Sequence, residues 1–167
     1  DRFFNGDTSN DVETDEYFYI GEGTEKVEDW NKYPAQMGVR EFYGGDIAGV
    51  WQKLDYLQDL GVEVIYFNPI FVSPSNHKYD IQDYDYIDPH IGKIVKDEGE
   101  LLKRSEQGNL MCDPAHPNKN ASRYICRVTD KENLEASNQF FADFVEEAHK
   151  RGMKVILDGV FNHCGSF

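Results

Sequence analysis

The chemistry-bearing residues nearest the end of the sequence are a carboxylate, an amide and an imidazole. Residues 155–157 are all aliphatic, which is typical of a strand buried on both faces of a parallel sheet. Asp158 comes where that strand should end, and Asn162 and His163 follow within one turn. Ligands bind at the carboxyl ends of parallel strands, so this spacing indicates a site. The alternative is that Asp158 caps a turn and His163 is an ordinary surface side chain.

Aromatic and polar side chains concentrate in residues 70–92, which follow an apolar run at residues 62–67. Sugar sites need flat aromatic faces for the C–H surface of a pyranose, and side chains that both donate and accept hydrogen bonds. This stretch offers both kinds of group at the carboxyl end of the preceding strand, and it therefore indicates a sugar-contacting loop. A tyrosine-rich loop that packs on itself is the alternative, and it suits Tyr84 and Tyr86.

Four oxygen-bearing side chains, Asn5, Asp7, Asn10 and Asp11, lie close together near residue 1. Hard cations such as calcium take about six to eight oxygen ligands. Gly6 would permit the tight backbone that such a loop needs. The spacing is not that of an EF-hand. On composition alone, a solvated turn remains the alternative to a metal loop.

Taken together, these segments resemble the alpha-amylase superfamily, glycoside hydrolase family 13, and within it the neopullulanase and amylopullulanase type. The long charged insertion and the Cys-Gly-Ser-Phe sequence at 164–167 add to the likeness, which extends over most of the chain. Its motifs are Asp-x-x-x-Asn-His at 158–163, Asp-Arg-Phe-x-Asn-Gly-Asp-x-x-Asn-Asp at 1–11, Gly-Gly-Asp at 44–46 and His-x-Tyr at 77–79.

The resemblance implies supporting roles for five residues. Tyr79 would stack on the sugar at the scission site, and His77 and His163 would hydrogen-bond sugar hydroxyls. Asp158 would hold a catalytic-site arginine that these residues do not include, and Asn162 would brace the loop. Such groups orient and distort the ring without breaking the bond themselves.

The resemblance also implies a bound calcium ion that pins the first loop to the rest of the domain. The ligands would be five side chains and one backbone carbonyl, that of Gly44. The alternative role for Asp46 is a helix N-cap, which its position also suits. The implied set is Asn5, Asp7, Asn10, Asp11, Gly44 and Asp46.

The catalytic carboxylates of the family are not among these residues. A retaining glycosidase needs two carboxyl groups about 5–5.5 Å apart, and the family carries its three acidic residues on later strands. We therefore expect residues 1–167 to be an N-terminal fragment of the catalytic barrel, inactive alone, from an enzyme that cleaves α-glucosidic bonds of starch, pullulan or maltodextrins. The alternatives are a non-catalytic amylase-like barrel that serves as a carbohydrate-binding or partner subunit, and a free-standing calcium-binding module.

Two helix-to-strand units must position these groups. Residues 1–46 lack periodicity and read as a long loop or several turns. Apolar spacing predicts a helix over residues 47–60, ended by Gly61 and followed by a buried strand over residues 62–67.

The second unit begins with a capping-box pattern at residues 129–132, which starts a helix that Gly152 ends. The strand at residues 155–157 follows. This order predicts an α/β fold with a parallel sheet. With the resemblance, it predicts a partial TIM (β/α)8 barrel that begins after its first strand. Residues 93–129 form a long charged insertion after the second strand.

The net charge of −14 disfavours nucleic acids and anionic membranes as partners. It fits an uncharged α-glucan or maltooligosaccharide substrate and a divalent cation, and the other expected partner is the remainder of the chain's own barrel. No apolar run approaches the length of about 18 residues that a membrane span needs. An export signal could precede residue 1. The resemblance to exported amylopullulanases implies an extracellular or cell-surface bacterial location, and the resemblance to neopullulanases, many of which stay cytoplasmic, gives a cytoplasmic location as the alternative.

Three cysteines do not make a disulfide framework, although a single Cys112–Cys126 bridge stays open. A zinc site that combines these two cysteines with His116 lacks the paired spacing of zinc motifs and is disfavoured.

Overall fold

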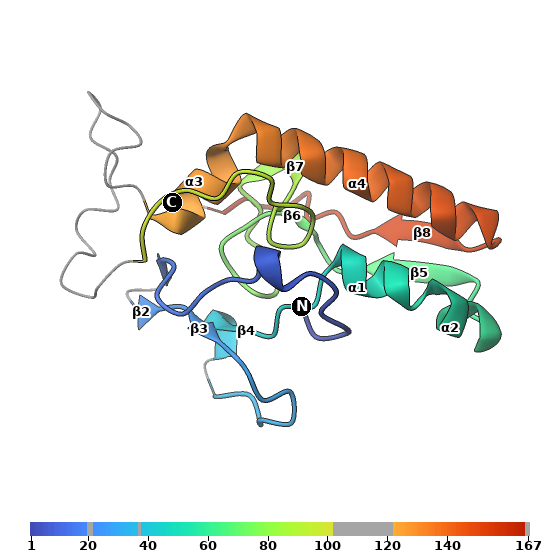
Figure 1. The fold of residues 1–167 in the computed structure, drawn as a ribbon, viewed down its shortest axis with the longest axis horizontal. Helices are drawn as coiled ribbons and strands as arrows, with labels where there is room; N and C mark the ends of the chain where they lie inside the picture. The colour runs from blue at the N-terminus through green and yellow to red at the C-terminus, as the bar shows by residue number, and fades with distance from the viewer. Residues whose placement is uncertain (20–21, 37, 102–121, 166–167) are drawn as a thin grey trace.

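The computed structural model describes residues 1–19, 22–36, 38–101 and 122–165, and within these ranges four two-stranded sheets combine with four α-helices (Figure 1). The helices are α1 (Ile47–Gln52), α2 (Leu54–Asp59), α3 (Arg123–Thr129) and α4 (Lys131–Lys150). The strands are β1 (Phe18–Tyr19), β2 (Glu22–Gly23), β3 (Glu25–Lys26), β4 (Glu41–Phe42), β5 (Val64–Phe67), β6 (Phe71–Val72), β7 (Asp83–Ile87) and β8 (Lys154–Leu157).

Strands β5 and β8 form the parallel pair that the helix-to-strand pattern predicts. Val64 pairs with Lys154, and Phe67 pairs with Leu157. Helix α4 runs alongside both strands, with α1 and α2 below it in the view of Figure 1. The α/β class is therefore confirmed, while the described residues form small sheets and no closed barrel.

Two predictions of burial are wrong: residues 155–157 are not buried on both faces, and residues 62–67 are not a fully buried strand. Ile65 and Phe67 pack against the core beneath α4, but Val64 is 44% exposed and Tyr66 58% exposed. On β8, Ile156 is 47% exposed. The physical reason is that α1 and α4 cover one face of the pair, and nothing in the described residues covers the other.

The predicted helix over residues 47–60 is divided at Lys53 into α1 and α2. The Lys53 backbone has φ −103° and ψ 5°, and its N–H donates to the Val50 carbonyl at 3.0 Å, which tightens the last turn of α1. The apolar stripe keeps its phase across the break, because Leu54 is as fully buried as Ile47. Gly61 has φ +83°, the left-handed conformation expected of a glycine that ends a helix.

Helix α4 carries the predicted apolar face. Phe144 and Ala148 are fully buried, and Gly152 ends the helix with φ +78°. The helix begins one residue later than the capping-box pattern indicates, because the Asp130 carboxylate, and not Thr129, accepts from the first-turn Glu132 N–H at 2.9 Å. No helix among the described residues is both long and apolar enough to cross a membrane.

Two elements lie where the sequence indicates only loops. Strands β6 and β7 form an antiparallel hairpin inside residues 70–92, and α3 occupies the end of the predicted insertion. Tyr124 and Val128 of α3 are buried in a second apolar cluster with Tyr17 and Phe42. Cys112 and His116, which the disulfide and zinc alternatives require, lie outside the described residues.

Candidate functional site

Three of the predicted contact residues meet at the carboxyl ends of β5 and β8. The Tyr79 phenol donates to Asp158 Oδ2 at 2.7 Å, and His163 Nε2 lies 3.1 Å from the Tyr79 carbonyl oxygen. The Asp158 N–H extends the sheet by donating to the Phe67 carbonyl at 3.0 Å. The strand pairing therefore brings together side chains that are distant in the sequence.

The backbone partners fix which nitrogen of each imidazole carries the proton. A carbonyl oxygen only accepts, so His163 Nε2 must donate to it, and Nδ1 of the neutral ring is an acceptor. The Tyr79 N–H donates to His77 Nδ1 at 3.1 Å, so the proton of neutral His77 is on Nε2. One histidine thus offers a free acceptor and the other a free donor.

His77 belongs to a compact hydrogen-bonded turn. Its Nδ1 also lies 3.1 Å from Ser75 Oγ, whose hydroxyl contacts Asp80 as well. The His77 and Tyr79 rings lie 6.1 Å apart, centroid to centroid, and both side chains are exposed. Asn162 is exposed and joins none of these contacts among the described residues.

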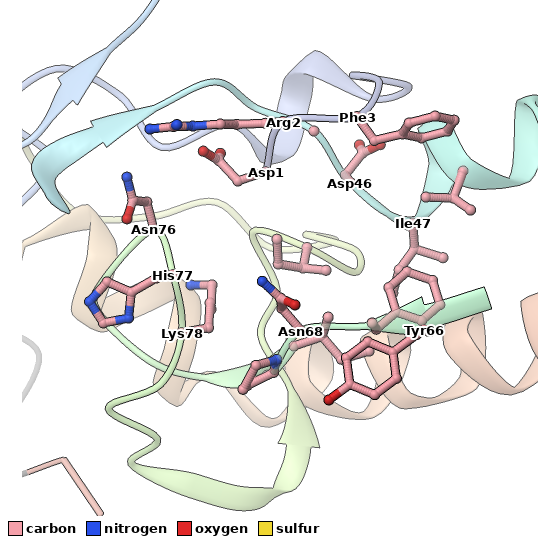
Figure 2. Close-up of a pocket in the computed structure, with 16 residues that line it drawn as sticks. Asp1, Arg2, Phe3, Asp46, Ile47, Tyr66, Asn68, Asn76, His77 and Lys78 are labelled. Carbon is pink, nitrogen blue, oxygen red and sulfur yellow. The ribbon is translucent and has the colours of Figure 1, made fainter. Parts of the chain in front are cut away.

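A cavity of about 490 Å³ lies beside this cluster (Figure 2). The end of β5 lines one part of it through Tyr66 and Asn68, and residues 76–78 line another. Of the contact residues, His77 lines the cavity, whereas Tyr79, Asp158 and His163 lie outside its lining and therefore stand next to it. Residues 1–3 and Asp46 lie on the opposite side.

Tyr66 is a neighbour of Asp158 that the sequence did not single out. Hydrogen bonding to the Asp158 carboxylate raises the pKa of both Tyr66 and Tyr79. Both phenols therefore stay protonated and act as donors. Tyr66 lies near the carboxyl end of β5, and its side chain is on the exposed face of that strand. Only the structure shows that Tyr66 lies within hydrogen-bonding reach of Asp158.

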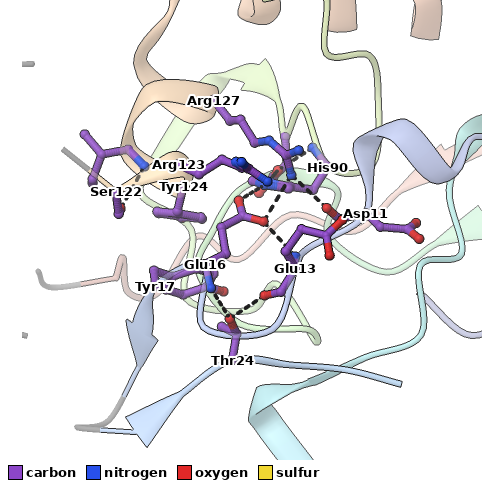
Figure 3. A network of polar contacts seen from close by, with 12 residues as sticks. Asp11, Glu13, Glu16, Tyr17, Thr24, His90, Ser122, Arg123, Tyr124 and Arg127 are labelled. Carbon is purple, nitrogen blue, oxygen red and sulfur yellow. Dashed lines mark hydrogen bonds and ion pairs between the residues drawn. The ribbon is translucent and has the colours of Figure 1, made fainter. Parts of the chain in front are cut away.

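Beneath the exposed turn lies a buried ionic network that the sequence did not predict. Lys78 Nζ lies 2.6 Å from Asp88 Oδ2, and His90 Nδ1 lies 2.9 Å from Asp88 Oδ1. His90 Nε2 in turn lies 2.6 Å from Glu16 Oε1. Arg127 Nη1 donates to Glu16 Oε2 at 3.0 Å (Figure 3). All five side chains are at most 5% exposed.

Arg127 ties this network to the first loop. Its Nη1 also donates to the Asp11 carbonyl at 2.7 Å, and its Nε and Nη2 donate to the two Asp97 oxygens at 2.9 Å each. The guanidinium therefore joins α3, the loop that ends at Asp11 and the loop that carries Asp97. The sequence signal was weak: Asp88 and His90 stand inside the otherwise apolar Ile-Asp-Pro-His-Ile of residues 87–91.

The charges in the network shift one another's protonation. Burial alone would lower the pKa of His90, but Glu16 and Asp88 outweigh it and raise that pKa. Burial alone would raise the pKa of Asp88, but Lys78 and His90 hold it well below its usual range. His90 is therefore an imidazolium between two carboxylates.

The residues of the predicted calcium set lie together. Asp46 has hydrogen-bond donors around both of its carboxylate oxygens, whereas Asn5 and Asn10 each carry a buried oxygen with no partner among the described residues. Asp46 is saturated by donors: its Oδ1 accepts from the Gly6 and Gly49 N–H groups, and its Oδ2 accepts from the Asp7 N–H and the Asn10 amide. The alternative role of helix N-cap is therefore correct for Asp46, because the Gly49 bond caps α1. The same carboxylate also fastens the first loop to that helix.

Two other members carry oxygen atoms without partners. Asn5 Oδ1 and Asn10 Oδ1 are buried and accept no hydrogen bond from the described residues, whereas Asp7 Oδ1 accepts from the Ser9 N–H at 3.0 Å. Asn5 Nδ2 donates to Asp11 Oδ1 at 2.8 Å, and Lys26 Nζ lies 3.0 Å from Asp11 Oδ2. Burial raises the pKa of Asp11 despite that lysine. Orphaned amide oxygens beside an undercompensated carboxylate are what a hard cation would satisfy.

Gly44 closes this group in a way that requires glycine. Its φ is +77°, and a Cβ there would lie 2.5 Å from both Asn5 Nδ2 and Asp11 Oδ1. A cavity of about 270 Å³, lined by Asn5, Asp11, Trp30 and Gly44, opens beside it. No group of three or more His, Cys, Asp or Glu side chains in the described ranges is arranged to hold a metal, so any cation here would depend on amide and carbonyl oxygens.

Comparison with known proteins gives a consistent set of relatives. Residues 1–113 match the sequence model described as alpha amylase, catalytic domain. An amylopullulanase from Thermoanaerobacterium saccharolyticum is 35% identical over 98% of this chain and 10% of its own length. Neopullulanase 2 from Thermoactinomyces vulgaris is 37% identical over 99% of this chain and 18% of its own length.

Among solved structures, the type III pullulan hydrolase from Thermococcus kodakarensis superposes with a TM-score of 0.63 at 33% identity. That match covers 99% of this chain and 22% of the hydrolase. The chain thus spans only about a tenth to a fifth of the length of these relatives.

Proposed function

The chain belongs to the alpha-amylase catalytic-domain family, and from that premise we propose that it supplies the substrate-binding part of a retaining glycoside hydrolase. The substrates are α-glucosidic: starch, pullulan or maltodextrins, in keeping with an amylopullulanase, a neopullulanase and a pullulan hydrolase among its relatives. Retaining hydrolysis needs a nucleophilic and an acid/base carboxyl group about 5–5.5 Å apart. We assign neither of them to these residues.

The observation that carries the proposal is the meeting of Tyr79, Asp158 and His163 at the ends of two parallel strands. The Tyr79 ring, oriented by its bond to Asp158, offers a flat face to the C–H surface of a glucose unit. His77 Nε2–H and His163 Nδ1 offer a donor and an acceptor, which matches hydroxyl groups that both donate and accept. Asp158 aligns the Tyr79 phenol, and in the proposed enzyme it also holds an arginine of the catalytic site. Asn162 is assigned the bracing of this loop.

We further propose that calcium stabilises the first loop through the set Asn5, Asp7, Asn10, Asp11, Gly44 and Asp46. The ion would supply positive charge to buried oxygens and would not take part in bond cleavage. The orphaned Asn5 and Asn10 oxygens and the raised pKa of Asp11 support this assignment. Asp46 contributes by holding the loop against α1.

The sugar-binding proposal is tested by titrating the chain with maltotriose and, as a matched ligand, with β-linked cellotriose, followed by NMR. Maltotriose is expected to shift the signals of Tyr79 and His163, and cellotriose to leave them unchanged. Tyr79→Ala should weaken maltotriose binding about tenfold or more, because a stacking ring and its hydrogen bond are lost. Tyr33→Ala is the control, since Tyr33 is 92% exposed and distant in sequence from the cluster.

Equal binding of both trisaccharides, or no loss with Tyr79→Ala, would contradict the assignment. A second assay separates binding from chemistry. The chain alone should release no reducing sugar from pullulan or starch, and release at a rate like that of an intact amylase would overturn the division of roles.

The calcium proposal is tested with terbium, a calcium substitute whose luminescence is excited by a nearby indole. Trp30 lines the cavity beside Asn5 and Asp11, so binding should give a Trp-sensitised signal that calcium displaces. Asp11→Asn should abolish the signal, and Trp30→Phe should remove sensitisation while the calcium-dependent rise in Tm persists. If Tm is the same in calcium and in excess chelator, the site is not a calcium site.

A further inference from the structure

Lys78 stands between the two proposed sugar contacts, His77 and Tyr79, yet it points away from them. Its backbone has φ +60°, a left-handed conformation that residues with a Cβ rarely adopt. In Figure 2 the His77 ring and the Lys78 side chain leave the chain in opposite directions. Lys78 is 4% exposed, whereas Tyr79 is 37% exposed. A long cationic side chain buried at a strained position needs a specific reason to stay there.

The reason is a site built around its ammonium group. Lys78 Nζ donates to Asp88 Oδ2 at 2.6 Å and to the Ser73 carbonyl at 2.7 Å. The Ser73 N–H donates to the same Asp88 oxygen at 3.1 Å. The other Asp88 oxygen accepts from His90 Nδ1 and from the His90 N–H, both at 2.9 Å. Four hydrogen bonds thus hold the Asp88 carboxylate in place, and the Lys78 ammonium group pairs with it there.

The backbone N–H groups of Lys78 and Tyr79 are hydrogen-bonded within the turn itself. The Lys78 N–H donates to Ser75 Oγ at 3.1 Å, and the Tyr79 N–H donates to His77 Nδ1 at 3.1 Å. Rotating Lys78 out of the interior would move both N–H groups. The imidazole would then lose the bond that fixes its proton on Nε2, and the Tyr79 phenol would be displaced from Asp158.

We propose that Lys78 is a positioning residue: its buried ion pair with Asp88 holds the left-handed turn that aims His77 and Tyr79 at the substrate. Lys78 itself touches no sugar. The effect of Lys78 on sugar binding rests on the proposed function. The claim that Lys78 fixes the positions of His77 and Tyr79 does not depend on it. The Asp88 end is secured by His90, Glu16 and Arg127, so the turn is anchored to α3 and not to its own hairpin alone.

The test compares Lys78→Met with Lys78→Met/Asp88→Asn in the full chain. The single variant leaves a buried carboxylate without its cation, whereas the double variant removes both charges and should recover stability. Lys96→Met is the control, because it removes an exposed lysine–aspartate pair, with Lys96 43% exposed, outside the turn. Maltotriose Kd, the urea midpoint and the ring-nitrogen NMR shifts of His77 are measured for each.

The single variant is expected to weaken maltotriose binding at least about tenfold, as for the loss of one well-placed polar contact. Its His77 ring nitrogens should change from the fixed Nε2–H pattern to averaged values. The double variant should regain its urea midpoint but neither the Kd nor the His77 pattern, which a purely stabilising role would restore. Lys96→Met should leave all three readouts as in the wild type.

The outcomes separate this inference from the proposed function. If the wild type does not bind maltotriose, the proposed function fails, and the His77 shifts alone decide the role of Lys78. If Lys78→Met keeps the fixed His77 pattern, the inference is overturned whatever the sugar does. Joint recovery of stability, Kd and His77 pattern in the double variant would likewise overturn it.

Discussion

His90 is a buried cation whose charge is set by two buried carboxylates, Glu16 and Asp88. It also stacks on Tyr124, with ring centroids 5.6 Å apart and the planes within 9°. Since these neighbours raise its pKa above the ordinary value, the folded chain binds the imidazole proton more tightly than the unfolded chain does. Folding and the protonation of this residue are therefore linked.

The linkage has a definite sign. A raised folded-state pKa gives stability that is complete below about pH 6.5, the ordinary histidine value, and that is lost as the pH rises through the folded-state pKa. Urea unfolding should therefore show a free energy that falls as the pH rises from about 6.5 through the raised folded-state pKa of His90. His90→Gln should flatten this decline, and His149→Gln, on an exposed side chain, should preserve it. A flat profile in the wild type would contradict the assignment.

Single-residue roles were predictable from the sequence where local chemistry decides them. Asp46 has the spacing of an N-cap and is one, and Gly61 and Gly152 end helices as their positions indicate. Glu16 and Arg127 were not predictable, because their contact joins residues 111 positions apart. In the sequence each looks like an ordinary surface charge, and only burial by distant segments gives it a structural role.

At the level of elements, α3 is fastened by one arginine. Arg127 is fully buried and bonds Glu16, which has no exposed surface. Removing one partner of a buried pair costs about 3–5 kcal/mol, because the other charge is left uncompensated. Arg127→Met is therefore expected to lower the unfolding free energy by about that amount.

Arg123 provides the matched control on the same helix. It is 30% exposed and lies 3.9 Å from Asp97, so Arg123→Met should cost less than about 1 kcal/mol. Urea unfolding of both variants at neutral pH measures these two costs. Equal costs for the two variants would mean that burial of Arg127 contributes nothing.

The N-cap residues of α1 and α4 differ in the contacts that they make outside their own helix. Asp130 bonds the first turn of α4 and an exposed lysine, and Asp130→Ala should cost about 1 kcal/mol. Asp46 caps α1 and also accepts from Gly6, Asp7 and Asn10. Bonds to a charged group contribute about 1.5–3 kcal/mol each, so Asp46→Ala should cost at least about 2 kcal/mol more. Similar losses of Tm in the two variants would show that Asp46 acts only as a cap.

Element types followed from periodicity, and element boundaries did not. The face of α4 was readable because Phe140, Phe144 and Ala148 recur at helical spacing. The break at Lys53 was not readable, because the apolar stripe continues through it. The hairpin of β6 and β7 was missed, since its residues are mostly polar or aromatic and its register contains an irregularity.

At the scale of the whole molecule, the parallel pair β5–β8 has one covered face and one apolar face that none of the described residues covers. Parallel sheets are normally covered on both faces. In the described residues the uncovered face carries Val64, Tyr66 and Ile156, each more than 40% exposed. An apolar surface of this kind favours self-association of the chain.

Neighbouring residues of β8 test this directly. Ile156→Thr should reduce self-association in sedimentation experiments and change stability by no more than about 0.5 kcal/mol, since the side chain is largely exposed. Val155→Thr points the hydroxyl into the core beneath α4, so it should cost about 1–3 kcal/mol. If Ile156→Thr leaves self-association unchanged, another surface is responsible.

The α/β class and the parallel pairing followed from the order of periodic segments. The contact of Tyr79 with Asp158 was not itself predicted, but it agrees with the placement of both residues at strand ends. Both residues follow strand-like runs, and strand ends meet at one edge of a sheet. The uncovered face did not follow, because an aliphatic run such as residues 155–157 predicts burial whether or not a covering layer is present.

The long sequence separation between β5 and β8 also affects the order in which the chain folds. The sheet joins the first half of the chain to its last strand, so the intervening segments must close a large loop before any ladder hydrogen bond forms. Hairpins and helices such as β6–β7 and α4 rest on local contacts, whereas this sheet needs a non-local pairing, so we expect it to form later in folding. We therefore expect the aromatic and imidazole groups at its tip to come together late, so that a ligand that requires them binds the folded chain.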